Sequence, residues 1–442
     1  MSEALLPSTD PFLNRTNRII IFLVFISVFV NSLVLATSPA EIYIGYVVFV
    51  LLIPVFFFRF GIPAHIGWIF GALLITGIVN VYLGKNTFPL FFKVFLGMFF
   101  SYLFYFYFLR AFDFKLEKIF YYYLKGAFFV SLLGIFQFIS FQIGFKPGYD
   151  YTWLLNKWGV ITGGNFGIRV NSIFGEPTYL STTLSPAFFI SAYNLFSRKP
   201  FHLKRYESIT ILVVYFLSFS GLGFAGILAT LVFLLINYGL IRYILLFIPI
   251  LIVSFNFLYN NVSEFQERYD GTVEVFGTGT FTIGKTHGSS IILYNNYHVA
   301  TENFKGNFLF GTGLGSHPVA FSKFSLTKNV KIHGFDLNSA DANSMLLRLI
   351  SETGLFGTSL MIFVLFFGFI KRNEEDPDVP DSFWLISNSI LIMILLNLFR
   401  QGHYFLNGFP LFLWIYYYNK VKYKAFISSR NSLPVSPQPS AV

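Results

Sequence analysis

Residues 19–37, IIIFLVFISVFVNSLVLAT, form an apolar run long enough to cross the hydrocarbon core of a bilayer as a helix. Arg15 and Arg18 stand just before this run. A strand of a membrane barrel would alternate between apolar and polar side chains, and this run does not. Because a backbone in lipid must satisfy its own hydrogen bonds, the run predicts a transmembrane α-helix.

Similar runs recur along the whole chain of 442 residues, of which 55% are hydrophobic and only 12% are charged. Soluble domains carry about 25% charged residues. The runs are divided into bilayer-sized pieces, which argues against one large soluble core. The composition therefore predicts an all-α polytopic membrane protein.

About twelve spans are expected, with both termini on the inner side because Lys and Arg flank the inner ends. They cover residues 19–37, 42–60, 65–83, 88–109, 127–145, a stretch from about 174 to 196, two short helices within 208–240, 243–258, 355–370, 383–399 and 409–419. The break between the two short helices, at 218–223, is expected to line a cavity. Residues 111–125 predict either an interfacial helix on the inner face or a solvated lead-in to the next span.

The expected organisation has four parts. Residues 1–258 hold nine membrane helices and a short outer loop at 146–173. Residues 259–345 form a large extracytoplasmic loop, and residues 346–424 hold the last three helices. Residues 425–442 are rich in Ser and Pro and predict a disordered inner tail.

Charge and cysteine content exclude several classes of function. The net charge of +10 follows from the flanks of the spans, and no basic, aromatic-interleaved soluble domain is present to bind nucleic acid. The absence of cysteine excludes disulfides, thiolate metal sites and a cysteine nucleophile. Histidine spacing matches no metal motif, so neither a metal nor a cofactor is expected.

The first candidate site is RVNSIFGEPT, residues 169–178, at the outer mouth of a span. Glu176 precedes Pro177, which suits a first helical turn, so a structural role at a helix N-terminus explains Glu176 equally well. Arg169 has no such explanation, and guanidinium groups are suited to phosphate recognition. Ser172 lies between them and joins the substrate-binding candidates.

The second candidate lies in residues 298–357, the one long polar, loop-like region of the chain. Its glycine turn, GTGLG at 311–315, is explained by turn chemistry as well as by phosphate binding. Asn343 is a candidate sugar contact. Arg348 and Glu352 are four residues apart, so a plain ion pair explains them as well as a catalytic pair does.

The third candidate is Arg400 with His403, at the outer end of the span 383–399. Ionisable residues at membrane depth are costly and often functional. Three further histidines, His298, His317 and His333, are expected to be solvated loop residues.

All of these groups fall on the predicted outer side. Arg169, Arg348 and Arg400 are therefore expected to converge on one cavity above the bilayer. Three guanidinium groups at a membrane surface suggest a lipid-linked phosphate or pyrophosphate, whose departure needs stabilisation of negative charge.

Three segments resemble the superfamily of O-antigen and exopolysaccharide polymerases (Wzy-type) and O-antigen ligases. These are RVNSIFGEPTYLS at 169–181, NFLFGTGLGS at 307–316 and NSMLLRLISETGLFG at 343–357. They occur in the family's order, around a large outer loop. In the ligase signature a histidine stands where this chain has Asn343, which favours a polymerase over a ligase.

The resemblance implies a GT-C-like, metal-independent, inverting glycosyltransferase of the bacterial inner membrane. We hypothesise that Arg169 and Arg348, with Arg400, hold the pyrophosphate of an undecaprenyl-pyrophosphate-linked glycan. Glu176 or His403 would act on the acceptor hydroxyl, and Glu352 would support catalysis by positioning Arg348. Implied partners are a chain-length regulator, a flippase of the same pathway and membrane lipid.

Two alternatives stay open at this point. One is an O-antigen ligase that transfers finished glycan to the lipid A core. The other is a polysaccharide flippase, which would need charged groups through the membrane depth, whereas charges here stay near span ends except Lys93.

Overall fold

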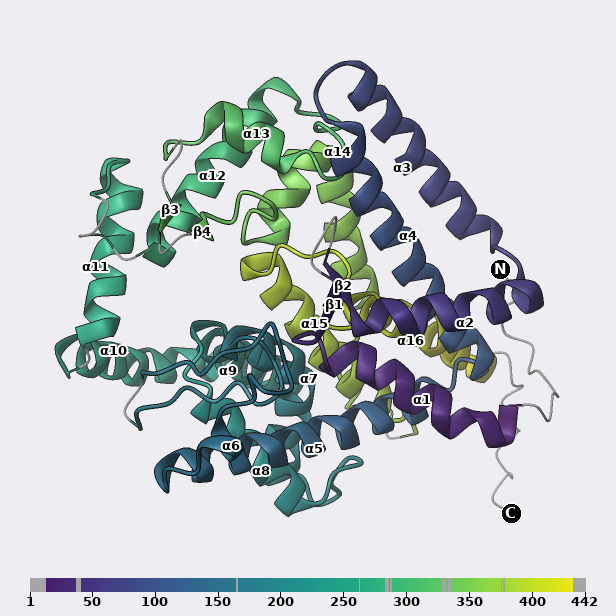
Figure 1. Ribbon diagram of the computed structural model, residues 1–442. Helices are drawn as coiled ribbons and strands as arrows, with labels where there is room; N and C mark the ends of the chain where they lie inside the picture. The colour runs from purple at the N-terminus through teal and green to yellow at the C-terminus, as the bar shows by residue number, and fades with distance from the viewer. Residues whose placement is uncertain are drawn as a thin grey trace, which may run out of the picture.

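The computed structural model describes residues 13–36, 41–163, 166–261, 263–282, 286, 288–327, 331–332, 335–374, 376 and 378–431. Helices dominate the described chain (Figure 1). Two small antiparallel pairs accompany them: β1 (Val34–Ala36) with β2 (Ile42–Tyr43), and β3 (Lys331–Ile332) with β4 (Phe335–Asp336). The expected all-α class is confirmed.

The helices follow in chain order as α1 (Leu13–Phe29), α2 (Ile44–Phe60), α3 (Ala64–Tyr82), α4 (Phe88–Ala111), α5 (Leu116–Gln142), α6 (Lys146–Tyr149), α7 (Pro177–Phe196), α8 (Arg205–Leu217), α9 (Gly221–Asn237), α10 (Ile244–Asn261), α11 (Ser263–Thr278), α12 (Gly288–Gly306), α13 (His317–Phe324), α14 (Met345–Gly368), α15 (Ser382–Arg400) and α16 (Phe409–Asn431). A short 3₁₀ turn, η2 (Ile241–Tyr243), precedes α10.

Five described helices are long and apolar enough to cross a membrane: α3, α4, α5, α14 and α15. Three shorter apolar helices, at Ile19–Phe29, Ile44–Phe60 and Gly221–Asn237, accompany them. Apolar side chains are exposed on the long helices, for example Trp68 on α3 and Phe366 on α14, and such surfaces suit contact with lipid. The chain is therefore a membrane-embedded helical protein.

Several helix boundaries differ from the predicted ones. α4 and α5 are separated only by a tight turn in which Asp113 and Phe114 adopt positive φ. Residues 116–125 are the start of α5 and continue into the rest of that helix, so they agree with the expected lead-in to the next span and not with an interfacial helix of their own. α16 runs to Asn431, well past the predicted span end at 419, so residues 425–431 of the expected disordered tail are helical. The rest of that tail lies outside the described residues.

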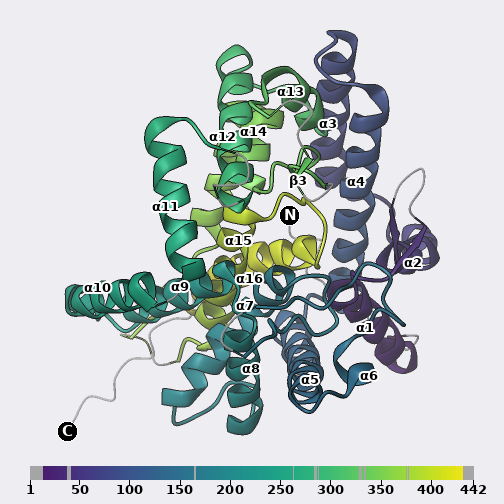
Figure 2. The same ribbon diagram turned by 60° about the vertical axis from the view of Figure 1, so that its left-hand side comes forward.

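Residues 259–345 were expected to form a loop, but α11, α12 and α13 occupy much of this segment. Several of its polar residues are buried and bonded internally rather than solvated. Asn296 Nδ2 donates to the Leu337 carbonyl at 3.0 Å, and Asn303 Nδ2 donates to Ser351 Oγ at 2.8 Å. α12, α13 and the first half of α14 lie beside the α3–α4 hairpin in both views (Figures 1 and 2).

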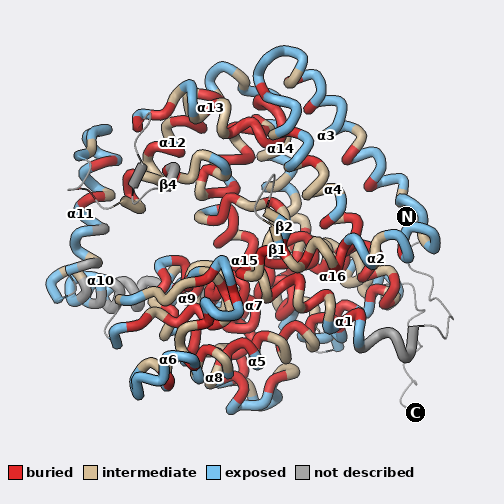
Figure 3. The backbone as a smooth tube through the Cα atoms, viewed as in Figure 1, coloured by how far each residue is buried: buried red, intermediate tan, exposed pale blue. Residues whose placement is uncertain are grey.

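The centre of the molecule is formed by α7 and α15, which pack against each other and are mostly buried (Figure 3). α7 also packs against α8 and α9. Many of its buried residues are small, including Ser181, Thr183 and Ser185, so neighbouring helices can approach closely. These two helices position the candidate site, because Glu176 precedes α7 and Arg400 ends α15.

The expected break between two short helices is confirmed, since α8 ends at Leu217 and α9 begins at Gly221. The serines at the break are packed against protein, however, instead of lining the expected cavity. Ser218 and Ser220 are buried, and the Leu217 carbonyl accepts a hydrogen bond from the Val170 amide at 3.0 Å. The outer loop is therefore tied to the end of α8.

Replacing Gly354 with alanine is expected to destabilise the protein strongly. Gly354 breaks α14 with a φ of 62°, and a Cβ there would lie 2.6 Å from the Gly311 nitrogen and 2.7 Å from the Leu309 carbonyl oxygen. Backbone strain and overpacking together predict a loss of about 2–4 kcal/mol. Thermal unfolding in detergent would measure it.

Gly277→Ala in α11 is the matched control, because a Cβ at this position would meet no heavy atom within 4 Å. Its unfolding temperature should equal or slightly exceed that of the wild type. Equal unfolding temperatures for Gly354→Ala and the wild type would contradict the packing described for α14.

Candidate functional site

Glu176 is the most accessible acidic side chain among the predicted site residues. It is exposed, and its carboxylate forms no hydrogen bond or ion pair with another described residue. Desolvation by surrounding protein nevertheless raises the pKa of Glu176. The charge of Arg169 opposes that rise and Asp341 reinforces it, while His403 and Lys157 oppose it more weakly. Glu176 is thus exposed, yet it lies within the electrostatic influence of the outer loop, the turn before α14 and the loop after α15.

Asp341 Oδ2 and His403 Nε2 lie 3.0 Å apart, within hydrogen-bonding distance. The other carboxylate oxygen of Asp341 accepts hydrogen bonds from the Asn343 amide at 3.0 Å and from Asn338 Nδ2 at 3.3 Å. Burial opposes ionisation, yet His403 and the Asn343 amide hold the pKa of Asp341 well below its usual range. Asp341 is therefore an ionised carboxylate that orients His403.

The loop that carries His403 approaches the turn before α14 very closely. A Cβ on Gly402 would lie 1.9 Å from the Asp341 carbonyl oxygen. Only glycine permits this contact, which brings His403 to Asp341. Ala342 and Asn343 both adopt positive φ in the same turn.

Arg348 and Glu352 form a buried ion pair, with Nε and Oε1 separated by 2.9 Å. Arg348 Nη1 also donates to the Gly402 carbonyl at 2.7 Å, and its guanidinium stacks 4.5 Å from the centre of the Tyr404 ring. The Tyr404 hydroxyl donates to Glu352 Oε2 at 3.0 Å. With Arg348 4% exposed and Glu352 0% exposed, neither lies open to a substrate.

This geometry changes the predicted role of Arg348 and agrees with that of Glu352. Arg348 was expected to hold pyrophosphate directly, but its guanidinium is occupied by protein groups inside the fold. Glu352 does position Arg348, as expected. Together they fix the loop of Gly402 and His403 onto α14, so their contribution to the site is structural.

Ser172 was expected to bind substrate, but it is fully buried. Its hydroxyl donates to the Val130 carbonyl at 2.9 Å, and its amide donates to Gln137 Oε1 at 2.8 Å. Trp158 Nε1 donates to the Ser172 carbonyl at 2.8 Å. Ser172 therefore anchors the outer loop onto α5, and this anchoring fixes the position of Arg169.

Arg400 and Asn343 stay at the edge of the cluster. Arg400 is half-buried at the C-terminal end of α15, where the helix dipole favours a cation, three residues before His403. The side-chain amide of half-buried Asn343 makes no hydrogen bond within the described chain. Both positions suit contact with a bound molecule.

Sequence reasoning missed a group of residues beside the cluster. Lys157 pairs with Glu41 at 2.5 Å and donates to the Tyr43 hydroxyl at 2.9 Å. Lys157 also lowers the proton affinity of Glu176. Its position between Trp153 and Trp158 in the outer loop was the available signal, whereas nothing near Glu41 indicated a site.

The glycine turn at 311–315 serves packing. Gly311, Gly313 and Gly315 all have positive φ, and a Cβ on Gly311 would lie 2.4 Å from the backbone of Glu352. The Gly313 amide donates to the Glu352 carbonyl at 2.8 Å. The turn therefore braces α14 at the level of its buried ion pair.

The expectation of solvated loop histidines fails at His317, which is fully buried in α13 and contacts Asn296 at 2.9 Å through Nε2. Burial lowers the pKa of His317 to about 3, so the imidazole is neutral. His298 lies on helix α12, and His333 lies outside the described residues. Within the described ranges, no three histidine or acidic side chains gather as a metal-binding group.

Fold and site together define a polytopic helical membrane protein with a polar cluster where the start of α7, the start of α14 and the end of α15 meet. Neither a scan against protein-family models nor a search of curated proteins finds a match to the chain.

Proposed function

We propose that the protein is an inverting membrane glycosyltransferase that joins lipid-linked oligosaccharide repeat units into O-antigen or another surface polysaccharide. The observation that carries the proposal is the accessible carboxylate of Glu176, which has a raised pKa and lies within the electrostatic influence of Arg169, Asp341 and His403. A carboxylate of this kind is suited to accept a proton, and nearby cations are suited to a phosphate leaving group.

In the proposed reaction, Glu176 removes the proton from an acceptor hydroxyl of the incoming repeat unit. The acceptor oxygen then attacks the anomeric carbon of the donor glycan. The bond between that carbon and undecaprenyl pyrophosphate breaks, and the pyrophosphate leaves with the bonding electrons. Arg169 and Arg400 stabilise the negative charge that develops on it.

The proposal includes the arrangement in the membrane. About twelve spans place this cluster on the outer face of the bacterial inner membrane, where flipped lipid-linked repeat units arrive. A flippase supplies those units, and a chain-length regulator sets the length of the product.

A ligase of the same superfamily is the second candidate. The Asp341–His403 pair favours it, because a histidine oriented by a carboxylate is a suitable base for an acceptor hydroxyl. The acceptor would then be the sugar of a lipid A core instead of a second repeat unit.

Reconstitution tests the proposal directly. The purified protein in lipid nanodiscs, given lipid-linked repeat units alone, is expected to produce a ladder of polymers and to release undecaprenyl pyrophosphate. Consumption only when lipid A core is added would identify a ligase. No consumption of the donor under either condition would contradict both candidates.

In that assay, the pH dependence of the polymerisation rate should follow the ionisation of Glu176. Glu176 must be ionised to accept a proton, so the rate falls as the pH drops through its raised pKa, and the acidic limb lies above the reference value of 4.5. Asp341→Asn removes a charge that raises this pKa and should move the limb to lower pH. Asp341 changes the pKa of Glu176 more than His403 does, so this pKa should still fall even if His403 loses its proton in the variant. If the acidic limb of the pH–rate profile stayed in place, the electrostatic coupling between Asp341 and Glu176 would be contradicted.

A further inference from the structure

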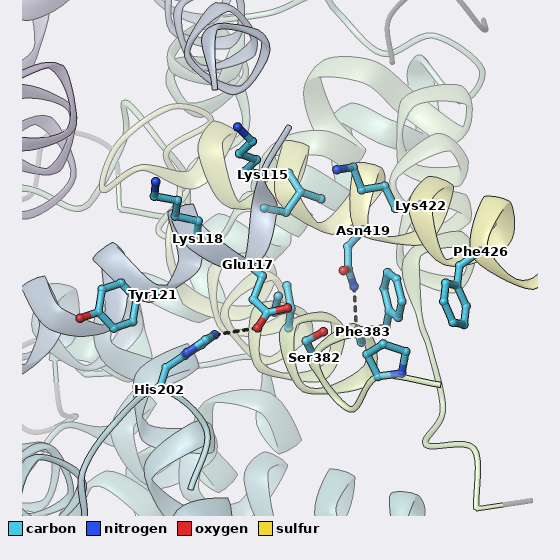
Figure 4. Close-up of a pocket in the computed structure, with 13 residues that line it drawn as sticks. Lys115, Glu117, Lys118, Tyr121, His202, Ser382, Phe383, Asn419, Lys422 and Phe426 are labelled. Atoms are coloured by element: carbon cyan, nitrogen blue, oxygen red, sulfur yellow. Dashed lines mark hydrogen bonds and ion pairs between the residues drawn. The ribbon is translucent and has the colours of Figure 1, made fainter. Parts of the chain in front are cut away.

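A cavity of about 590 Å³ lies far from the candidate site (Figure 4). It is lined by the start of α5, the loop after α7, the start of α15 and the second half of α16. Glu176 precedes α7 and His202 follows its end, while Ser382 begins α15 and Arg400 ends it. Helices of 20 and 19 residues extend about 30 Å, so the cavity and the candidate site lie at opposite ends of the same two helices.

Three lysines lie along one side of this cavity: Lys115, Lys118 and Lys422 (Figure 4). Lys118 and Lys422 form no ion pair with another described residue. The charge of Asp113 acts on Lys115, which lies 3.7 Å away, and also on Lys422. Three lysines against one carboxylate nevertheless leave the lining of the cavity formally positive.

The acidic side chains nearby are already engaged. Glu117, the one carboxylate among the lining residues, lies 3.0 Å from His202 Nε2. Arg430 pairs with Asp376 at 2.6 Å and with Asp378 at 3.0 Å. The charge inside the cavity is therefore positive, which favours an anionic occupant.

The opposite wall of the cavity is apolar. The rings of Phe383 and Phe426 lie 5.8 Å apart, with Leu116 and Ile386 also among the lining residues. Asn419 Nδ2 donates to the Phe383 carbonyl at 2.7 Å and fixes α16 against α15 at this point. A charged side facing an apolar wall suits a molecule that carries an anion next to an apolar part.

We propose that this cavity binds a phosphate group attached to a small apolar or glycerol-like moiety. Lysine ammonium groups bind phosphate as mobile point charges with three donors each. The volume is in the range of small-molecule sites, about 300–1,000 Å³. The phosphate belongs either to the headgroup of an anionic lipid or to a soluble phosphomonoester. This site stands independently of the glycosyltransferase proposal, because no residue is shared.

Binding to the purified full-length protein tests this inference with two probes, dihexanoyl phosphatidic acid and glycerol 3-phosphate. Isothermal titration is expected to show saturable binding of at least one probe. The Lys118→Gln/Lys422→Gln double variant should raise its Kd about tenfold or more. Lys199→Gln, an exposed lysine in the loop after α7, is the matched control and should leave Kd unchanged.

A variant that binds the probe more tightly shows that the loss of binding in the lysine variant is not caused by misfolding. Glu117→Gln removes the one carboxylate in the lining and should lower the Kd several-fold, which a damaged protein would not do. Comparable binding of both probes would identify a soluble phosphomonoester as sufficient, and binding of phosphatidic acid alone would identify a lipid headgroup. No binding of either probe, or equal Kd values for the wild type and the double lysine variant, would overturn the inference.

Discussion

Replacing Glu176 with glutamine is expected to lower polymer formation at least about 100-fold, because general-base catalysis typically contributes that much or more. The carboxylate is exposed and unbonded within the described chain, so the isosteric amide should fold normally. The rate of donor consumption by the reconstituted protein would measure the loss, with the unfolding temperature as a check on folding.

Glu274→Gln is the matched control, since Glu274 is an exposed carboxylate on α11 away from the cluster. It should polymerise at the wild-type rate. If Glu176→Gln kept full activity and His403→Gln were inactive, His403 would be assigned as the general base in place of Glu176. Full activity of both variants would contradict the proposed site.

Replacing Arg348 with methionine is expected to destabilise the fold by about 3–5 kcal/mol, because it leaves the buried Glu352 without its ionic partner. Methionine fills a similar volume, so the loss reports charge more than cavity formation. The unfolding temperature and the amount of protein in the membrane should both fall. This result would separate a structural role from the direct phosphate contact that the sequence suggested.

The double variant Arg348→Met/Glu352→Gln should recover most of the lost stability. No buried charge is then left unpaired, and the new amide keeps an oxygen that can accept the hydrogen bond from Tyr404. Failure of the second substitution to restore the unfolding temperature would contradict the structural role. If Arg348→Met left the unfolding temperature unchanged and removed only activity, Arg348 would contact the substrate after all.

The membrane helices were largely predictable because apolar length is a local property. The predicted spans at 65–83, 88–109 and 383–399 correspond closely to α3, α4 and α15. The prediction gave residues 259–345 only as a large extracytoplasmic loop, and the helices within this segment were not predicted. Asn296 and Asn303 instead bury their amides in bonds to residues more than 40 positions away, which no local pattern reveals.

The candidate site was predictable in part. Arg169, Arg348 and Arg400 were expected to converge on one cavity, and of these three Arg169 acts electrostatically on Glu176, whereas Arg348 is buried in the fold. The roles of Arg348 and Ser172 were not predictable, because burial decides them. A guanidinium at the start of a span looks identical in sequence whether it faces substrate or an internal carboxylate.

Asp341 and Lys157 were missed as members of the cluster for a related reason. Asp341 stands next to a recognised motif, but its importance comes from the approach of Gly402, which brings His403 to within 3.0 Å. Lys157 reaches Glu41 across 116 positions of sequence. Such long-range pairs emerge only once the helices are packed.

The most direct test of the proposed function is a gel of lipopolysaccharide and lipid-linked glycans from cells that lack the gene, complemented with wild type or Arg169→Ala. We predict that the deletion leaves single repeat units on the core without a ladder, that wild type restores the ladder, and that Arg169→Ala reaches the membrane but does not. Full-length polymer stranded on undecaprenyl pyrophosphate would contradict the proposal in favour of a ligase. Single repeat units held on the inner leaflet would contradict it in favour of a flippase.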